Sequence, residues 1–268
     1  MLSSAASPTP YPARRRFGMT RLIPSLIATV LLGAAAACQA GEPDASPSPS
    51  AEPTANPEVC SETAEGVALS EEGWSVTKTA DGEQWVSYAA VFEVDPEVIS
   101  VDLRVEWFDA DGEPLGWGDG SGDAPTYQSL PLMLSNGVGV VSDFAWVVGE
   151  IDTIDYTVTR ACRTTEDIDS TATIDITDAV LEPGSGDEAE LVMDVASGFD
   201  EPVDTGLSIV FRDEAGSIIG GTLATDTNIK LSQVAPGDSQ YVLTFGWEDF
   251  YPDPADIAET TAYPGLPR

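Results

Sequence analysis

The sequence predicts an all-β protein built from two tandem antiparallel β-sandwiches. Apolar and polar residues alternate with a period of two in several segments after residue 60, as they do on half-buried strands. A pattern of strand, acidic turn and second strand then recurs about 100 to 104 residues later. Since no segment after residue 60 shows a long 3.6-residue periodicity, the folded part is expected to lack helices.

The alternating segments identify the expected core of the first sandwich. Every second residue is apolar in segments 86–94, 101–107 and 154–158, and Cys162 is expected on the same face as the last of these. The apolar positions are Val86, Tyr88, Ala90, Phe92, Val94, Val101, Leu103, Val105, Trp107, Ile154, Tyr156 and Val158. Four large aromatic residues are also assigned to cores: Trp74, Trp107, Trp146 and Phe211.

The repeat divides the folded part into domains at 59–165 and 166–268. Each copy has an acidic turn whose glycine supplies a positive φ, Asp109–Gly112 and Asp213–Gly216. Phe144-Ala145-Trp146 also parallels Phe245-Gly246-Trp247, and each aromatic run follows a turn that ends in glycine. A copy of about 100 residues with some seven short strands is typical of an immunoglobulin-like sandwich. Because the polar joint at 163–167 is short, the domains are expected to sit end to end.

The second copy resembles the FxLYD family of extracytoplasmic bacterial domains. Its matching residues are Phe211, Asp213, Gly216, Leu231, Pro236, Gly237 and Phe245. In the first copy Phe108, Asp109 and Gly112 match, but Asn136 replaces the proline. The resemblance implies an immunoglobulin-like sandwich on a lipoprotein, and it transfers no catalytic residue.

The N-terminus reads as an export signal that ends at Cys38. Four arginines precede an apolar run over residues 22–37, and Ala35-Ala36-Ala37-Cys38 closes it. This order resembles the lipobox of bacterial lipoproteins, which implies a signal peptide at 1–37 and acylation of Cys38, typically including palmitate. The protein would then be anchored on the extracytoplasmic face of the cell membrane. An ordinary secretory signal and a transmembrane anchor are the alternatives, although the run of 16 residues is short against the ~20 of a spanning helix.

The true start (Met1 or Met19) and the export route (general secretory or twin-arginine) stay open. Residues 38–58 are rich in Pro, Ser and Ala and contain no large apolar side chain. This composition predicts a disordered tether that reaches roughly 60 Å at most. Together with the Ala-rich signal, it suits an actinobacterium.

The three cysteines predict one disulfide bond. If Cys38 carries lipid, Cys60 and Cys162 remain, and an exported protein can pair them. Such a bond would close a loop of about 100 residues, for which the chain-entropy model gives roughly 4–5 kcal/mol. Two buried free thiols are the alternative.

Charge and composition exclude several functions. The net charge is -35, and residues 39–268 carry 7 basic and 46 acidic residues, which gives 7 - 46 = -39. A phosphate backbone would be repelled, so no nucleic acid partner is expected. The chain has no histidine, which removes Ser-His-Asp sites and His-ligated zinc. We therefore expect no enzyme activity and no cofactor, with a hydrolase that uses carboxylates alone as the alternative.

The acidic segment 109–113 looks like the opening of a calcium loop. An EF-hand needs Gly at its sixth position and Glu at its twelfth, where this chain has Pro114 and Gly120. A hairpin turn is therefore expected, and no metal site is predicted. A calcium ion held by this turn together with the acidic loop 119–123 stays an alternative.

Trp117 and Tyr127 are the candidate ligand contacts. Trp117 lies between two glycines, where its ring could stack on a sugar or anchor a protein, or fold back over its own sandwich. The sequence thus predicts a membrane-anchored, non-catalytic binding module whose partner is an envelope protein or a glycan. A carboxylate-dependent envelope hydrolase and a calcium-binding surface protein are the alternatives.

Overall fold

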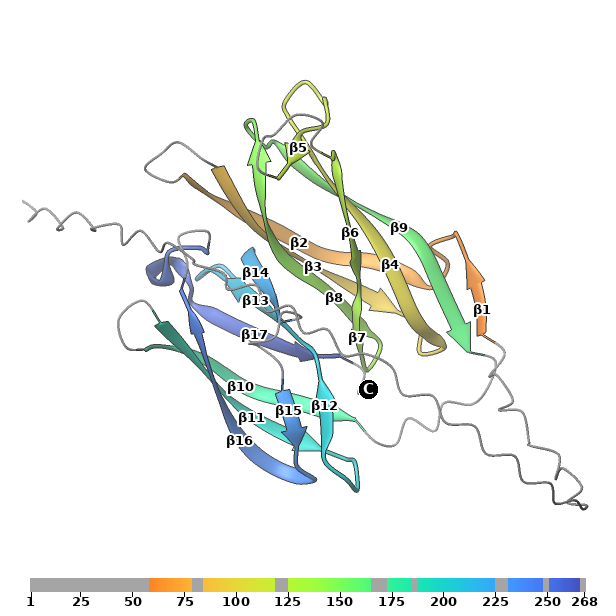
Figure 1. Cartoon of the computed structure of the whole chain (residues 1–268), viewed down its shortest axis with the longest axis vertical. Helices are drawn as coiled ribbons and strands as arrows, with labels where there is room; N and C mark the ends of the chain where they lie inside the picture. The colour runs from red at the N-terminus through yellow and green to blue at the C-terminus, as the bar shows by residue number, and fades with distance from the viewer. Residues whose placement is uncertain are drawn as a thin grey trace, which may run out of the picture. The chain divides into compact units, whose positions relative to one another are not determined.

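The computed structural model describes residues 58–78, 84–118, 125–164, 173–184, 188–224, 231–247 and 251–265. The predicted signal peptide, Cys38, the tether up to residue 57 and the loop 119–123 lie outside these residues. Glu52–Arg268 forms one compact unit. Its described residues form antiparallel strands and one short 3-10 helix, which confirms the all-β sandwich prediction (Figure 1).

The first pair of sheets forms the N-terminal sandwich. Its strands are β1 (Glu58–Ser61), β2 (Val67–Lys78), β3 (Gln84–Val94), β4 (Val98–Phe108), β5 (Gly116–Trp117), β6 (Tyr127–Pro131), β7 (Met133–Ser135), β8 (Val138–Val148) and β9 (Thr153–Thr164). One sheet has the order β1-β9-β4-β6. The other has the order β2-β3-β8-β5, with β7 also paired to β8.

The second set of sheets forms the C-terminal sandwich. Its elements are β10 (Ile174–Pro183), β11 (Glu188–Ser197), β12 (Val203–Thr205), β13 (Leu207–Arg212), β14 (Ile218–Ala224), β15 (Leu231–Val234), β16 (Gly237–Gly246), the 3-10 helix η1 (Pro254–Asp256) and β17 (Glu259–Pro264). The two main sheets have the orders β10-β11-β16 and β14-β13-β17, and β12 pairs with β15. Sheet β2-β3-β8 therefore corresponds to β10-β11-β16, and the β4–β9 pair corresponds to β13–β17.

The predicted alternation places the core residues of β3 and β4 correctly. All four apolar residues of 101–107 are buried, as are the five of 86–94. On β9 the prediction for Cys162 is wrong. A bulge between the pairs Leu103–Val158 and Asp102–Arg160 changes which of the later side chains face the core. Ala161 therefore joins the core cluster, and Cys162 is buried on the opposite face.

Of the four aromatic residues assigned to cores, Trp107 and Phe211 are fully buried. Trp74 is half-buried against the N-terminal core. The assignment of Trp146 to the core is wrong. Ala145 and Val147, the residues on either side of it in β8, point into the core, so Trp146 points outward. The Trp146 ring instead lies on the outer face of its sheet and stacks on Trp85, with ring centroids 6.0 Å apart.

The two acidic turns adopt the same hydrogen-bonded structure. Asp109 Oδ1 accepts hydrogen bonds from the backbone N–H groups of Asp111 and Glu113, at 3.0 and 2.9 Å. Asp213 Oδ1 accepts them from the residues at the same spacing, Ala215 and Ser217, both at 2.9 Å. The turn glycines have φ of 79° and 81°. The equivalence holds at an offset of 104 residues and confirms the hairpin interpretation.

The predicted match between the two aromatic runs is wrong by one residue. In β16 the inward position is taken by Phe245, whereas in β8 it is taken by Ala145. Phe144 points out of its own sandwich and packs against the core of the other one, edge-on to Tyr251 with ring centroids 6.1 Å apart. The turn glycines Gly137 and Gly237 are 100 residues apart, and this spacing correctly aligns β8 with β16.

The two sandwiches share a buried apolar interface, which corrects the end-to-end prediction. Three residues of β3 and β8, Ala89, Val91 and Val140, cluster with Val210 of β13 and Ile218 of β14. The sheet β2-β3-β8 is therefore covered on both faces, by its own core and by the second sandwich. The short linker does not force an end-to-end arrangement, because apolar side chains on the outer face of this sheet favour burial.

Side chains of the N-terminal sandwich satisfy backbone groups of β14 across this interface. Ser87 Oγ donates to the carbonyl of Gly221 and accepts from its N–H, both at 3.0 Å. Ser142 Oγ donates to the carbonyl of Thr222 at 2.8 Å. A methyl group on Gly221 would collide with Ser142 and Ala89, so glycine is required for this close approach.

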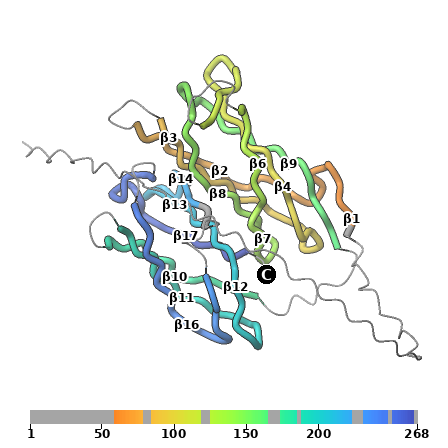
Figure 2. The backbone as a smooth tube through the Cα atoms, in the orientation of Figure 1, coloured from red at the N-terminus to blue at the C-terminus, as the bar shows by residue number. Residues whose placement is uncertain are grey.

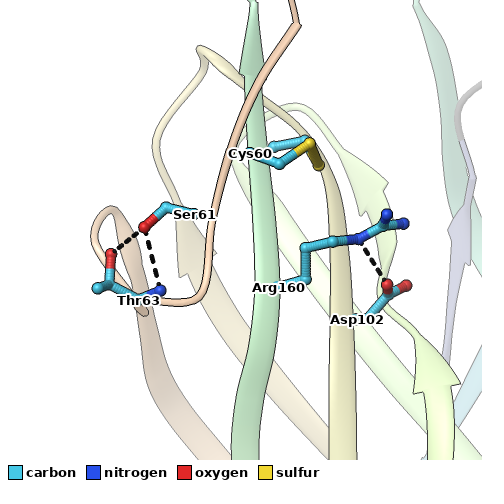
Figure 3. The surroundings of a disulfide bond; sticks show 6 residues. Cys60, Ser61, Thr63, Asp102 and Arg160 are labelled. Carbon is cyan, nitrogen blue, oxygen red and sulfur yellow. Dashed lines mark hydrogen bonds and ion pairs between the residues drawn. A yellow bond between two sulfur atoms is a disulfide. The ribbon is translucent and has the colours of Figure 1, made fainter.

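The predicted disulfide between Cys60 and Cys162 is present (Figure 3). The two cysteines lie opposite each other in the β1–β9 ladder and are 102 residues apart in the sequence. Nearby, Arg160 Nε donates to Asp102 Oδ2 at 2.9 Å, which links β9 to β4. The disulfide therefore attaches the short edge strand β1 to the sandwich.

A candidate groove between two sheet edges

An open groove of about 830 Å³ runs along one edge of the C-terminal sandwich. It lies between β10 and β17, which are side by side but belong to different sheets (Figure 2). Its apolar lining includes Ile176 and Leu181 of β10, Ala262 of β17, Trp247 and Ile257. The groove thus exposes part of the inner layer of the sandwich.

Strand β10 has an irregular backbone where it borders the groove. The β10–β11 register shifts between Thr177 and Val180, and Asp178 lies in the left-handed region with φ of 51°. A bulge bends its strand and increases the local twist. In consequence Val180 is half exposed at the rim of the groove.

The internal repeat explains why the groove is open. Through the β4–β9 register, Trp107 pairs with Ile154 and Val105 pairs with Tyr156. Through the β13–β17 register, the equivalent residues Phe211 and Ile209 pair with Thr260 and Ala262. Ala262 therefore occupies the position of Tyr156, and Thr260 occupies that of Ile154. Two large inward side chains of the first sandwich are small in the second.

In the N-terminal sandwich Tyr156 fills the equivalent space. Its ring centroid lies 6.4 Å from that of Tyr88 and 6.3 Å from that of Phe92. Its hydroxyl group is buried and has no hydrogen-bond partner among the described residues, so the ring is held by apolar packing. Burial and the nearby Glu72 carboxylate raise the pKa of this hydroxyl well above its usual value.

The groove is strongly acidic. Four carboxylates line it, those of Asp178, Glu182, Glu188 and Glu259, and no basic side chain is found among the described residues of the lining. Within 173–265 the sequence has only two basic residues, Arg212 and Lys230. Arg212 Nη1 lies 2.6 Å from Glu71 Oε2 of the N-terminal sandwich, and Lys230 lies outside the described residues. The carboxylates of the groove therefore attract cations.

The predicted contacts Trp117 and Tyr127 lie together in the other sandwich, away from the groove lining. Trp117 packs against the core beside Trp107, with ring centroids 6.4 Å apart, and its Nε1 donates to the carbonyl of Tyr127 at 2.7 Å. This ring has folded back over its own sandwich. The Tyr127 ring is half exposed, and the Arg104 guanidinium lies 5.8 Å from its centroid.

The acidic residues outside the groove include one carboxyl group with a shifted pKa, that of Glu72. Burial, and after it the nearby Asp155, raises the pKa of the Glu72 carboxyl above its ordinary value. This pair lies in the N-terminal sandwich, beside Tyr156, rather than in the groove. The parts of the chain that the structure describes contain no cluster of three or more His, Cys, Asp or Glu side chains able to hold a metal ion. Nor do they contain a helix long and apolar enough to span a membrane.

The sequence pattern does not predict the groove. Its one sequence signal is the run of small residues Thr260-Thr261-Ala262 near the C-terminus, where the first copy has Ile154 and Tyr156. That comparison requires the strand register, because the two copies differ in length between the acidic turn and the last strand. No family model matches the chain, and no curated protein matches it by sequence.

Proposed function

We propose that this protein is an exported, membrane-anchored binding module that holds an envelope partner in the groove between β10 and β17. The observation that carries the proposal is the groove itself, an apolar floor with an acidic rim. Pockets that bind ligands typically have volumes of about 300–1,000 Å³ and combine apolar lining with a few polar groups. The groove, at about 830 Å³, has both properties.

The buried interface supports a binding role. The two sandwiches share apolar contacts and buried hydrogen bonds, so the groove is built on a rigid support rather than on a free domain. A site on rigid elements keeps its shape before the partner arrives, which lowers the entropic cost of binding. The N-terminal sandwich then acts as the support and the C-terminal sandwich carries the site.

Export and anchoring are supported by the disulfide and by the N-terminal sequence. Disulfides persist in extracytoplasmic compartments, and Cys60–Cys162 is one. Cys38, at the end of the apolar run, is the proposed acylation site, which leaves residues 39–57 between the lipid and β1. Fractionation of cells that express wild-type or Cys38→Ala protein tests the anchor. Release of the variant alone into the medium is expected, and equal release of both proteins contradicts it.

Photo-crosslinking in intact cells tests the binding role. A photoreactive phenylalanine replaces Val180, at the rim of the groove, in the full-length chain. The matched control places it at Val242, which is exposed to nearly the same extent, 53% against 50%, but does not line the groove. A discrete crosslinked product from position 180 alone is expected, and it should disappear when Ala262→Tyr is added. Identical products from both positions would contradict the proposal.

A further inference from the structure

We propose that the groove binds an extended segment of a partner protein in which apolar residues alternate with Lys or Arg, and that this segment adds to β10 as a strand. The inference rests on the proposed binding function and names the class of partner. It follows from three features of the groove: two sheet edges, an apolar floor and an acidic rim without basic residues.

The sheet edges supply backbone recognition. In the described part of the chain β10 pairs with β11 alone, and β17 pairs with β13 alone. Each of these strands therefore has one edge that makes no ladder hydrogen bonds among the described residues, and both edges border the groove. An extended peptide pairs with such an edge through its own N–H and C=O groups. β10 is the longer of the two, with 10 residues against 6, and its regular stretch after the bulge, Val180–Pro183, borders the groove and is the proposed template.

The floor and the rim supply side-chain recognition. Side chains of an added strand point alternately to opposite faces, so every second one enters the groove and meets Ile176, Leu181 and Ala262. The remaining side chains point away from the floor, within reach of the carboxylates of Glu182 and Glu259 at the rim. An alternation of apolar and basic residues satisfies both surfaces.

The charges exclude the nearest competing occupants. A second copy of this chain would bring its own acidic surface against the acidic rim, and like charges at an interface are unfavourable. The tether of the same chain is acidic and lacks large apolar residues, so it offers nothing to the floor. An acidic envelope polymer would be repelled. A basic partner is attracted, and the attraction is stronger at low ionic strength.

Fluorescence anisotropy with synthetic peptides tests the inference on the full-length chain. The probe is a labelled ten-residue peptide that alternates Val and Lys. A second peptide alternates Val and Glu, and a third has the composition of the probe but with all Val before all Lys. Saturable binding of the alternating Val-Lys peptide alone is expected, with hydrogen-exchange protection of the β10 amides.

Two variants separate the groove from general adsorption to an acidic protein. Ala262→Tyr restores the residue found in the first sandwich and leaves the charge unchanged, and it should weaken binding about tenfold or more. Glu182→Gln/Glu259→Gln should weaken it severalfold and flatten its dependence on NaCl. Asp200→Asn/Glu201→Gln removes the same charge outside the groove and should leave binding unchanged. Melting curves confirm that each variant is folded.

Three results would overturn the inference. Equal affinity of wild type and folded Ala262→Tyr would mean that the peptide adsorbs elsewhere. Equal losses from the two charge-removing variants would mean that only net charge matters. Absence of binding by the Val-Lys peptide, while the crosslink at position 180 still forms, would leave the binding function in place and reject this class of partner.

Discussion

Three buried serines at or near the interface should respond very differently to replacement by alanine. Ser87 Oγ makes two hydrogen bonds to the backbone of Gly221, and Ser142 Oγ makes one to Thr222. Ser208 is equally buried, but its hydroxyl has no hydrogen-bond partner in the described structure. Leaving a buried backbone group unsatisfied costs about 1–3 kcal/mol. Ser87→Ala should therefore cost roughly 2–6 kcal/mol and Ser142→Ala about 1–3 kcal/mol.

Ser208→Ala is the internal control, because it removes a buried polar atom without orphaning another group. Its effect on the free energy of unfolding should be near zero or slightly stabilising. Urea denaturation followed by tryptophan fluorescence measures all three variants, and the m-value shows whether unfolding stays cooperative. If Ser208→Ala destabilises the protein as much as Ser87→Ala, the loss comes from packing, and the hydrogen bonds do not hold the sandwiches together.

Three further predictions concern the disulfide and the charges. Replacing both Cys60 and Cys162 by Ser should lower the free energy of unfolding by up to about 4–5 kcal/mol and abolish the effect of dithiothreitol on the melting temperature. Because the pKa of Glu72 is raised, the stability that this carboxyl contributes is full below pH 4.5 and is lost as pH rises through the folded-state pKa. Glu72→Gln should therefore flatten this loss in melts across the same pH window, and an unchanged profile would contradict the assignment. Moderate NaCl should raise the melting temperature by screening self-repulsion, whereas CaCl₂ at matched ionic strength should add nothing. A calcium-specific rise that Asp109→Ala removes would make the first acidic turn a metal site.

The sequence predicts the fold class and the strands that alternate clearly, but not what covers their outer faces. Val101 to Trp107 alternate with polar residues, and both their burial and their direction are predicted correctly. On β3 three of the four residues between the core positions, Ser87, Ala89 and Val91, are buried, although periodicity assigns them to solvent. They are buried because β13 and β14 cover them. That contact joins residues more than 100 positions apart, so no local pattern reports it.

The candidate site was less predictable than the fold. Trp117, an aromatic residue between two glycines, is a candidate ligand contact by sequence, yet its ring packs against the core of its own sandwich. The groove instead results from a side chain that is small, Ala262, and small residues in a strand carry no pattern of their own. Their meaning depends on the register with β13 and on the comparison with Tyr156. Such a site can be recognised only when the strand registers of both copies are known from the structure.

The shared interface has a practical consequence for dissecting this protein. Dividing the chain between β9 and β10 follows the boundary suggested by the repeat. On the N-terminal fragment, however, Ala89, Val91 and Val140 would become exposed to water. The C-terminal fragment would lose the serine hydroxyl groups that form hydrogen bonds with the backbone of β14. Each fragment would therefore expose part of the interface and would be prone to aggregate. The smallest fragment suited to expression therefore contains both sandwiches, even though the internal repeat suggests two separate domains.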